Sequence, residues 1–418
     1  MSAKLIQIAT AATLLLGPSA ASAADCKITV GAVLELTGPA GSYGQAGAKG
    51  LGMALRDINA AGGVRGCDLV ADIRDSQSQG NVAVDAATQL VQVQKVPLVI
   101  GGIISAVSLP ILTSVTAPAK VVQISPASSS PTLTALGRAG KTNGVFFRTI
   151  PSDALQAVAA AKFALDKGFK RLAIIHINSD FGVNLTTEFS KTYKSLGGEI
   201  VSTTPYNERQ SSYQSEITSA LKGNPDALYM VTTPIDGATI ARTWISQGGV
   251  QKFMLSDGMY SQDFIKAVGA EYLKEAYGTA AGTKDTASTE YFNKVFKEFS
   301  GMDPGSPPAN RAYDAAAIAG LALAIAGSED RSKIRDAVYA AVDPDGTPIH
   351  AGKEEFAKAF ALIKDGKKIR YEGVIGPIVF DKFGDITASF SLWQITNGQA
   401  KTIDEMSIDD VNKIKAGL

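Results

Sequence analysis

Histidine and cysteine are scarce in this 418-residue sequence, which contains two of each. His176 and His350 lie far apart, without the cysteine or carboxylate spacing of a zinc site. His176 ends an apolar run, which is typical of a packed histidine at the end of a strand. These absences exclude the common metal sites and leave no histidine with an evident catalytic partner.

Catalytic motifs are missing as well. The sequence has no Gly-x-Ser-x-Gly elbow and no Gly-x-Gly-x-x-Gly turn after a strand. Residues 138–142 imitate the end of a phosphate loop, but Ala135 stands where its first glycine belongs. We therefore expect no enzyme, no cofactor and no metal, although groups assembled only by folding escape a search of this kind.

Net charge is absent too, because 40 Lys and Arg balance 40 Asp and Glu. A nucleic-acid partner would need a basic surface, so none is expected.

The only long apolar run is residues 5–16, preceded by Lys4 and followed by Gly17-Pro18 and Ala21-Ser22-Ala23. About a dozen apolar residues are too few to cross a hydrocarbon core of ~30 Å, which argues against a membrane anchor. We expect a cleaved signal peptide at residues 1–23 and a soluble, periplasmic mature chain.

The two cysteines each begin a predicted strand. Cys26 precedes the run 28–33, and Cys67 precedes the run 69–73. If the two strands are parallel neighbours, a disulfide would close a loop of about 40 residues and contribute roughly 4 kcal/mol. Two unpaired thiols are the alternative. A lipidated Cys26 fits poorly, because Asp25 directly precedes it.

Short apolar runs alternate with alanine-rich segments of helical length along most of the chain. This alternation predicts parallel sheets covered on both faces. The predicted strands are 28–33, 69–73, 96–100, 121–124, 172–176, 200–204, 227–231 and 252–255. The predicted helices between them are 47–59, 81–94, 155–167, 186–196 and 212–222.

The alternation pauses at residues 147–153 and again near 277–282, and helices are predicted at 289–300 and 312–326. The C-terminal region reads as strands at 378–380 and 389–395, with a hairpin turn at Asn397-Gly398. We expect two doubly wound α/β lobes joined by a multi-strand hinge. One lobe would comprise residues 24–148 and 279–375, and the other 149–278 and 376–418.

Three loops follow predicted strands of the first half and are candidates for a binding site. In parallel sheets, ligands bind beyond the carboxyl ends of strands, where free N–H groups at helix starts favour a carboxylate. Ser105 follows one strand and residues 125–131 follow the next, although serines here could equally serve only as helix caps. Tyr43 follows the first strand and would either cover the pocket or pack on the surface.

These stretches together resemble the leucine/isoleucine/valine-binding proteins of bacterial ABC transporters, a family of type I periplasmic binding proteins. The resemblance covers nearly the whole mature chain. The matching segments are 28–33, 36–39, 43–44, Gly50, 57–64 with Gly66, 124–127, 147–148, 313–315, 376–377, 380–381 and Gly384.

The resemblance implies roles for individual residues. It assigns the ligand carboxylate to Ser105 and to a cradle formed by Ala127, Ser128 and Ser129, with backbone groups and the Ser129 hydroxyl as donors. Tyr43 would border the pocket. In the second lobe, Phe181 would cover the ligand and Asp257 would pair with its ammonium group.

Two positions depart from the family pattern. Thr233 stands where the amino-acid binders carry a tyrosine, and Asp257 is one methylene shorter than the family's glutamate. Both changes leave room for a bulkier side chain or an aromatic acid. If the ligand had no amine, a desolvated Asp257 would need another donor.

The resemblance implies the substrate-binding component of an ABC importer, which captures an amino acid by hinge closure and delivers it to the permease. The expected ligand is a branched-chain or other hydrophobic amino acid, and an aromatic or other small carboxylic acid is the alternative. The partners are the permease subunits, and the protein itself is expected to be a monomer. A ligand sensor and an extracytoplasmic α/β hydrolase or transferase remain as rivals.

Overall fold

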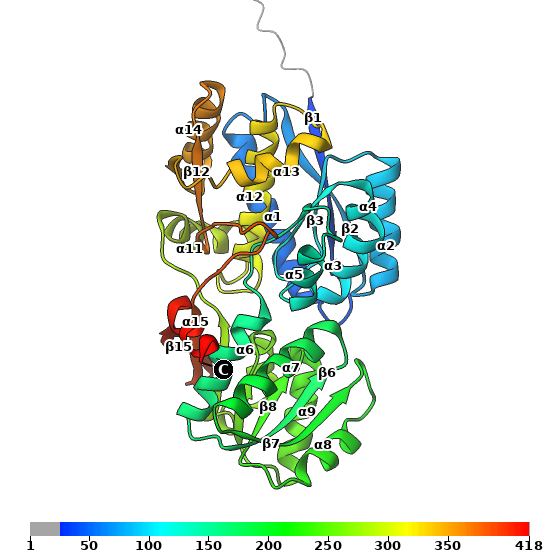
Figure 1. Cartoon of the computed structure of the whole chain (residues 1–418), viewed down its shortest axis with the longest axis vertical. Coiled ribbons are helices and arrows are strands. Elements are labelled where there is room, and N and C mark those ends of the chain that lie inside the picture. Colours follow the sequence, from blue (N-terminus) through cyan, green and yellow to red (C-terminus); the bar gives the residue numbers. More distant parts are fainter. Residues whose placement is uncertain (1–25, 418) are drawn as a thin grey trace, which may run out of the picture.

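The computed structural model describes residues 26–417, which form two α/β lobes stacked along the long axis of the molecule (Figure 1). The first lobe contains a five-stranded sheet of order β2-β1-β3-β4-β5 and a small sheet β11-β12-β13. The second contains a seven-stranded sheet of order β15-β14-β10-β9-β8-β6-β7. The expected fold class is confirmed, and the signal expected at residues 1–23 lies outside the described residues.

The first lobe is assembled from two separate parts of the chain. Its elements are β1 (Lys27–Leu34), α1 (Gly41–Ala60), β2 (Asp68–Asp75), α2 (Gly80–Thr88), β3 (Leu98–Gly101), α3 (Ser105–Ile111), α4 (Ala117–Ala119), β4 (Val122–Ser125), α5 (Pro131–Arg138) and β5 (Phe146–Arg148), then α11 (Ala287–Ser300), α12 (Ala309–Ala326), α13 (Arg331–Ala340), β11 (Thr347–Ile349), α14 (Lys353–Lys364), β12 (Ile369–Gly373) and β13 (Gly376–Pro377). The five strands of its main sheet are all parallel.

The second lobe also draws on two parts of the chain. Its elements are α6 (Asp153–Asp166), β6 (Arg171–Ile177), α7 (Asp180–Ser195), β7 (Glu199–Tyr206), α8 (Gln214–Leu221), β8 (Ala227–Val231), α9 (Pro234–Ser246), β9 (Lys252–Leu255), α10 (Gln262–Val268) and β10 (Glu275–Ala281), then β14 (Phe390–Thr396), β15 (Gln399–Met406) and α15 (Ile408–Ala416). The predicted hairpin is present, with positive φ at Asn397 and Gly398 between the antiparallel strands β14 and β15.

Three connections join the lobes, at residues 149–152, 282–286 and 378–389. The expected boundaries differ from the packing at two places. Residues 279–281 belong to the second sheet, where Thr279 pairs with Leu392. Most of the third connection packs on the first lobe, because Ile378, Phe380 and Ile386 lie in its core. The chain therefore leaves that lobe after Ile386, and not at residue 376 as expected. Buried apolar side chains, rather than the start of a β-like pattern, set this boundary.

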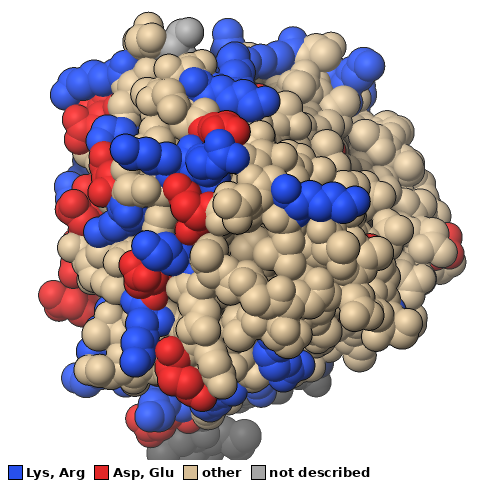
Figure 2. Space-filling view, turned by 90° about the horizontal axis from the view of Figure 1, so that it is seen from below, with Lys and Arg blue, Asp and Glu red and all other residues tan. Residues whose placement is uncertain are grey.

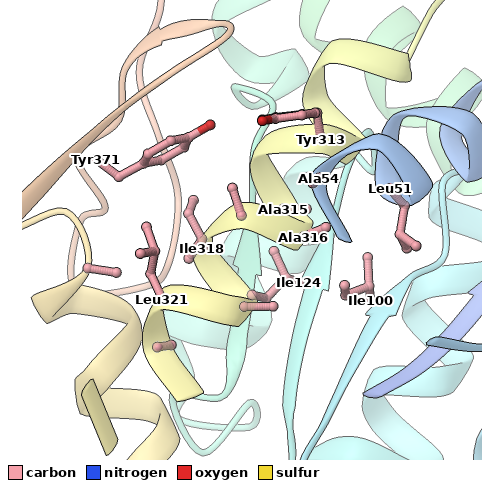
Figure 3. Packing of buried hydrophobic residues seen from close by; sticks show 14 of the residues in the cluster. Leu51, Ala54, Ile100, Ile124, Tyr313, Ala315, Ala316, Ile318, Leu321 and Tyr371 are labelled. Carbon is pink, nitrogen blue, oxygen red and sulfur yellow. The ribbon is translucent and has the colours of Figure 1, made fainter. Parts of the chain in front are cut away.

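The core of the first lobe lies between its sheet and the helix pair α1 and α12. Figure 3 shows Ala316 of α12 among Leu51 and Ala54 of α1 and the strand residues Ile100 and Ile124. All five side chains are buried. The small side chains of α12 let it lie close to both the sheet and α1. This close packing holds α12 in place, with its first residues near the connections.

Cys26 and Cys67 are joined by a disulfide across a separation of 41 residues. They directly precede the parallel strands β1 and β2, where Lys27 pairs with Asp68. The bond therefore lies at the amino-terminal ends of these strands, and the binding-site loops follow the carboxyl-terminal ends.

On the face of the second lobe seen in Figure 2, basic and acidic side chains are intermixed along one side, and much of the remainder carries no charge. That face offers no continuous basic patch for a polyanion. Within residues 26–417 we find neither a helix long and apolar enough to span a membrane nor a cluster of three side chains able to hold a metal.

Candidate functional site

A cavity of about 300 Å³ lies between the lobes. Seven of the eight ligand-binding residues expected from the sequence line it, and Ser128 is the exception. These residues are Tyr43, Ser105, Ala127, Ser129, Phe181, Thr233 and Asp257. We call the first four the first-lobe wall and the other three the second-lobe wall. Folding thus brings together side chains that are more than 200 residues apart in sequence.

Ser105 is the first residue of α3 and is 2% exposed. Its hydroxyl oxygen accepts a hydrogen bond from the backbone N–H of Ser130 at 3.2 Å, which leaves its hydroxyl proton for another acceptor. The loop before it is held by the buried carboxyl of Glu35, which accepts from the N–H groups of Ile103 and Ile104 at 3.1 and 3.2 Å. Burial raises the pKa of Glu35 to about 7.

The loop after β4 divides its three serines among different tasks. Ser130 caps α5 by accepting from Thr132 N, which is the capping role left open by the sequence. Ser128 is engaged within the lobe: its hydroxyl donates to Ile103 O at 3.1 Å, and its N–H donates to the Ser125 hydroxyl at 3.0 Å. Ser128 is therefore not among the residues that line the cavity, unlike the expected cradle, and its polar groups connect the two loops. Ser129 alone of the three lies on the cavity wall.

Arg148 supports this loop from behind. Its Nη1 donates to the carbonyls of Ser128 and Ser130, both at 3.1 Å. Its Nε donates to Asp385 Oδ1 at 2.7 Å, which ties the loop to the third connection. Both side chains are largely buried, so this ion pair is protected from solvent.

Hydrogen bonds cross from one lobe to the other at several places, and two of these contacts lie away from the connections. On one side, the Tyr43 hydroxyl donates to the carbonyl of Gly258. On the other, Thr132 Oγ1 donates to Asp180 Oδ1 at 2.9 Å, and Asn184 Nδ2 donates to Thr132 Oγ1 at 3.3 Å. Phe181 is the neighbour of Asp180 and lines the cavity. These contacts hold the two walls against each other in the conformation described here.

Asp257 begins a single helical turn after β9. Its Oδ1 accepts from Gln156 Nε2 at 3.1 Å. Burial raises the pKa of Asp257, whereas the bond from Gln156 and the charge of Arg311 oppose that rise. Thr233 precedes α9, and its hydroxyl is buried without a partner among the described residues. The second-lobe wall thus presents a carboxylate and an unsatisfied hydroxyl.

Three further charged residues of the site were missed from the sequence, and one of them, Glu208, lines the cavity from the loop after β7. Asp153 is fully buried behind Ser129, whose hydroxyl donates to its Oδ2 at 2.9 Å. Burial and then the nearby charge of Asp257 raise the pKa of Asp153. Arg311 lines the cavity at 7% exposure, and burial lowers its pKa to about 10. Arg311 is one of two charged residues in α12, a helix rich in buried alanine, and that position was the available signal.

The cavity walls offer hydrogen-bonding groups to a small molecule. Ser129 is hydrogen-bonded to a carboxyl group, but no histidine lines the cavity. His176 contacts the carbonyl of Ile177 at the end of β6, in the packed position expected for it. The hydroxyls of Ser105 and Ser129 face Asp257 across the gap, which matches a small molecule with a carboxylate and a separate hydrogen-bond donor.

Known proteins show which family the whole chain resembles. The family model described as "Periplasmic binding protein" matches residues 27–399. The substrate-binding protein BasB of the chemotactic signal transduction system of Halobacterium salinarum is 26% identical, with 93% of this chain and 90% of that protein covered. The Leu/Ile/Val-binding protein BraC3 of Rhizobium johnstonii is 29% identical, with 93% and 97% covered. The crystal structure of the leucine-binding protein LivK of Thermotoga maritima has a TM-score of 0.78 at 23% identity, with 92% and 99% covered, and it shares the fold.

Proposed function

The chain belongs to the periplasmic binding protein family, and on that basis we propose that it is the extracytoplasmic substrate-binding component of an ABC importer for an amino acid. Ser105, Ala127 and Ser129 would hold the ligand carboxylate, and Asp257 would hold its ammonium group. The protein would act as a monomer and deliver the ligand to the permease subunits. The ligand would leave chemically unchanged.

One observation carries the proposal: the first-lobe wall and Asp257 face the same cavity from opposite lobes. The Ser105 hydroxyl keeps its proton for an acceptor, and no partner among the described residues binds the backbone N–H of Ser129. Both are suitable donors to a carboxylate. Asp257 lies where a cation would relieve its partial desolvation.

Capture would proceed by closure of the hinge. The ligand first binds to the first-lobe wall, which is shaped by hydrogen bonds within that lobe. The second-lobe wall then closes over it, and the contacts of Tyr43 with Gly258 and of Thr132 with Asp180 form. A ligand shifts this equilibrium only by interactions that the open form lacks, so Phe181 and Asp257 must provide the differential affinity.

The ligand side chain would lie against Phe181, Thr233 and the neighbouring apolar residues. Relatives named as Leu/Ile/Val-binding proteins support a branched-chain or other hydrophobic amino acid. An aromatic or other small carboxylic acid is the second ligand class, because Gln156 already gives Asp257 one donor when no amine is present. Thr233 in place of a larger side chain leaves space for either class.

The direct test is a thermal-shift screen of amino acids, aromatic acids and short amides, followed by calorimetry of the strongest hits. We expect a rise in melting temperature and 1:1 binding for at least one carboxylate-bearing compound. Mass spectrometry after incubation should return that compound unchanged. Failure of every carboxylate to bind, or turnover of the bound compound, would contradict the proposal.

A ligand sensor is the second candidate function, favoured by the similarity to BasB over 93% of this chain. A sensor and a transport component share the same capture step and differ in the partner of the closed form. Reconstitution with the permease and ATPase subunits of an ABC importer would separate them. Ligand-stimulated ATP hydrolysis would support transport, and its absence together with binding to a signalling protein would support sensing.

A further inference from the structure

Arg311 is a buried cation that the proposed capture step does not use. It is the third residue of α12, lines the cavity and is 7% exposed. A charge in such a position is costly unless hydrogen bonds compensate it. In Arg311, hydrogen bonds to backbone carbonyls compensate this cost.

Its guanidinium group reaches two of the three connections between the lobes. Nη1 donates to the carbonyl of Thr149 at 2.8 Å, in the first connection. Nη2 donates to the carbonyl of Ala281 at 3.0 Å, where β10 ends and the second connection begins. In return, Thr149 Oγ1 donates to the carbonyl of Arg311 at 3.0 Å. One side chain thus bridges both connections beside the ligand cavity.

The backbone of Arg311 is fixed to the first lobe. The start of α12 lies so close to α1 that an added Cβ on Gly50 would be 1.9 Å from the carbonyl oxygen of Ala309. Arg311 therefore extends from a rigid helix. Any change in the path of either connection must move its carbonyl relative to this fixed donor.

We propose that Arg311 is a positioning residue for ligand capture, because it fixes the two connections in the geometry at which the second-lobe wall meets the ligand. This inference rests on the proposed function. It assigns Arg311 no direct ligand contact, so at a pH well above the pKa of Asp257 its loss should weaken every ligand by the same factor.

The charge of Arg311 should also affect how ligand affinity depends on pH. The groups facing Asp257 are Asp153 and Gln156 of α6, Arg311 of α12, Tyr43 of α1 and Tyr229 of β8. Arg311 is the cation among them, and its charge opposes the raised pKa of Asp257. Removing it should raise that pKa further. As the pH is lowered, an amine ligand that needs ionised Asp257 would then begin to lose affinity at a higher pH than with the parent protein. The affinity for an acid without an amine would show no such shift.

The experiment compares Arg311→Met and Arg311→Lys with a matched control, Arg331→Met. Arg331 of α13 also donates to two backbone carbonyls, those of Val91 and Val96, but both lie within the first lobe. Calorimetry with L-leucine and with benzoate measures affinity from pH 5 to 8. Hydrogen–deuterium exchange of residues 149–152 and 282–286 measures the connections without any ligand.

We expect Arg311→Met to weaken both probes by about tenfold, because two hydrogen bonds from a charged donor are lost. Arg311→Lys should cause a smaller loss, since an ammonium group lacks the planar fork. Both connections should exchange faster in Arg311→Met, and L-leucine affinity should begin to fall at a higher pH than in the parent. Arg331→Met should change neither affinity nor exchange in the connections.

Two results would overturn the inference. Unchanged exchange and affinity would show that Arg311 does not hold the connections. A loss confined to one of the two probes would show that it contacts the ligand directly. If the parent binds neither probe nor any compound of the screen, the proposed function fails, and the exchange of the connections still decides whether Arg311 holds them.

Discussion

The two walls of the cavity use their polar groups in different ways. In the first-lobe wall, Ser105 and the loop before it are bonded within the lobe, because Ser105 accepts from Ser130 and Glu35 holds the preceding loop. The hydroxyls of Tyr43 and Ser129 also have partners, Gly258 and Asp153 of the second lobe. In and behind the second-lobe wall, the Thr233 hydroxyl, Asp153 Oδ1 and the Tyr229 hydroxyl are buried without a partner among residues 26–417.

This difference indicates that the two walls have different roles in binding. A buried polar atom without a partner costs about 1–3 kcal/mol, so the second lobe has more to gain from a ligand or bound water than the first. The first-lobe wall is shaped in advance for any carboxylate. The second-lobe wall would decide which carboxylate is retained.

The largest expected effect is a loss of stability in the first lobe that leaves its ligand affinity nearly unchanged. Replacing Cys26 and Cys67 together by serine should lower the unfolding free energy by about 4 kcal/mol, because the disulfide closes a loop of 41 residues. Urea denaturation measures this loss. Ligand affinity should stay within about twofold of the parent below the unfolding transition, since the bond lies at the strand ends opposite the cradle. A large loss of affinity would mean that the first-lobe wall is not shaped locally.

The second prediction concerns discrimination by the second lobe. Asp257→Asn keeps the size of the side chain but removes its charge, so the Kd for an amino acid should rise about 100-fold. The Kd for a simple carboxylic acid such as benzoate should change by less than about threefold. Calorimetry with both compounds measures the contrast, and an equal effect on both would remove Asp257 from the ammonium site.

The third prediction tests whether the first lobe treats all carboxylates alike. Ser105→Ala removes one donor to the carboxylate and the acceptor for Ser130 N, so both ligand classes should bind about tenfold more weakly. Ser195→Ala is the control, because its hydroxyl donates to Lys191 O within α7 and does not line the cavity. Calorimetry that finds Ser105→Ala harmless to both ligands would contradict the cradle.

The smallest expected effect lies outside both walls. Thr132→Val removes the hydrogen bond to Asp180 across the lobes and should weaken all ligands about threefold, by disfavouring the closed form. Thr187→Val is the matched control on α7, since Thr187 donates only to Val183 O of its own helix. Small-angle scattering would follow closure. If the two variants behaved alike, the contact would be incidental.

Much of the fold could be predicted from the sequence, because its signals are local. Apolar runs bounded by glycine and serine predicted β1 to β4 and β6 to β9, and the placement of Cys26 and Cys67 before neighbouring strands predicted their bond. The loops carrying Ser105 and Ser129 follow adjacent parallel strands, so their convergence followed from topology.

The remaining features depend on packing between distant segments. Asp153 and Arg311 are single charged residues whose roles arise only from the groups around them, and no spacing rule identifies such groups. Ser128 has the same residue type as Ser129 but is turned toward Ile103 and Ser108. The lobe boundary near Ile386 follows from the side on which three apolar residues are buried.

The most direct test is a crystal structure of the protein with the strongest amino-acid ligand of the screen. The ligand carboxylate should lie within hydrogen-bonding distance of the Ser105 hydroxyl and the Ser129 backbone N–H, with its ammonium group at the Asp257 carboxylate. A ligand bound in the reverse orientation, or outside the cavity between the lobes, would contradict the division of roles between the two walls.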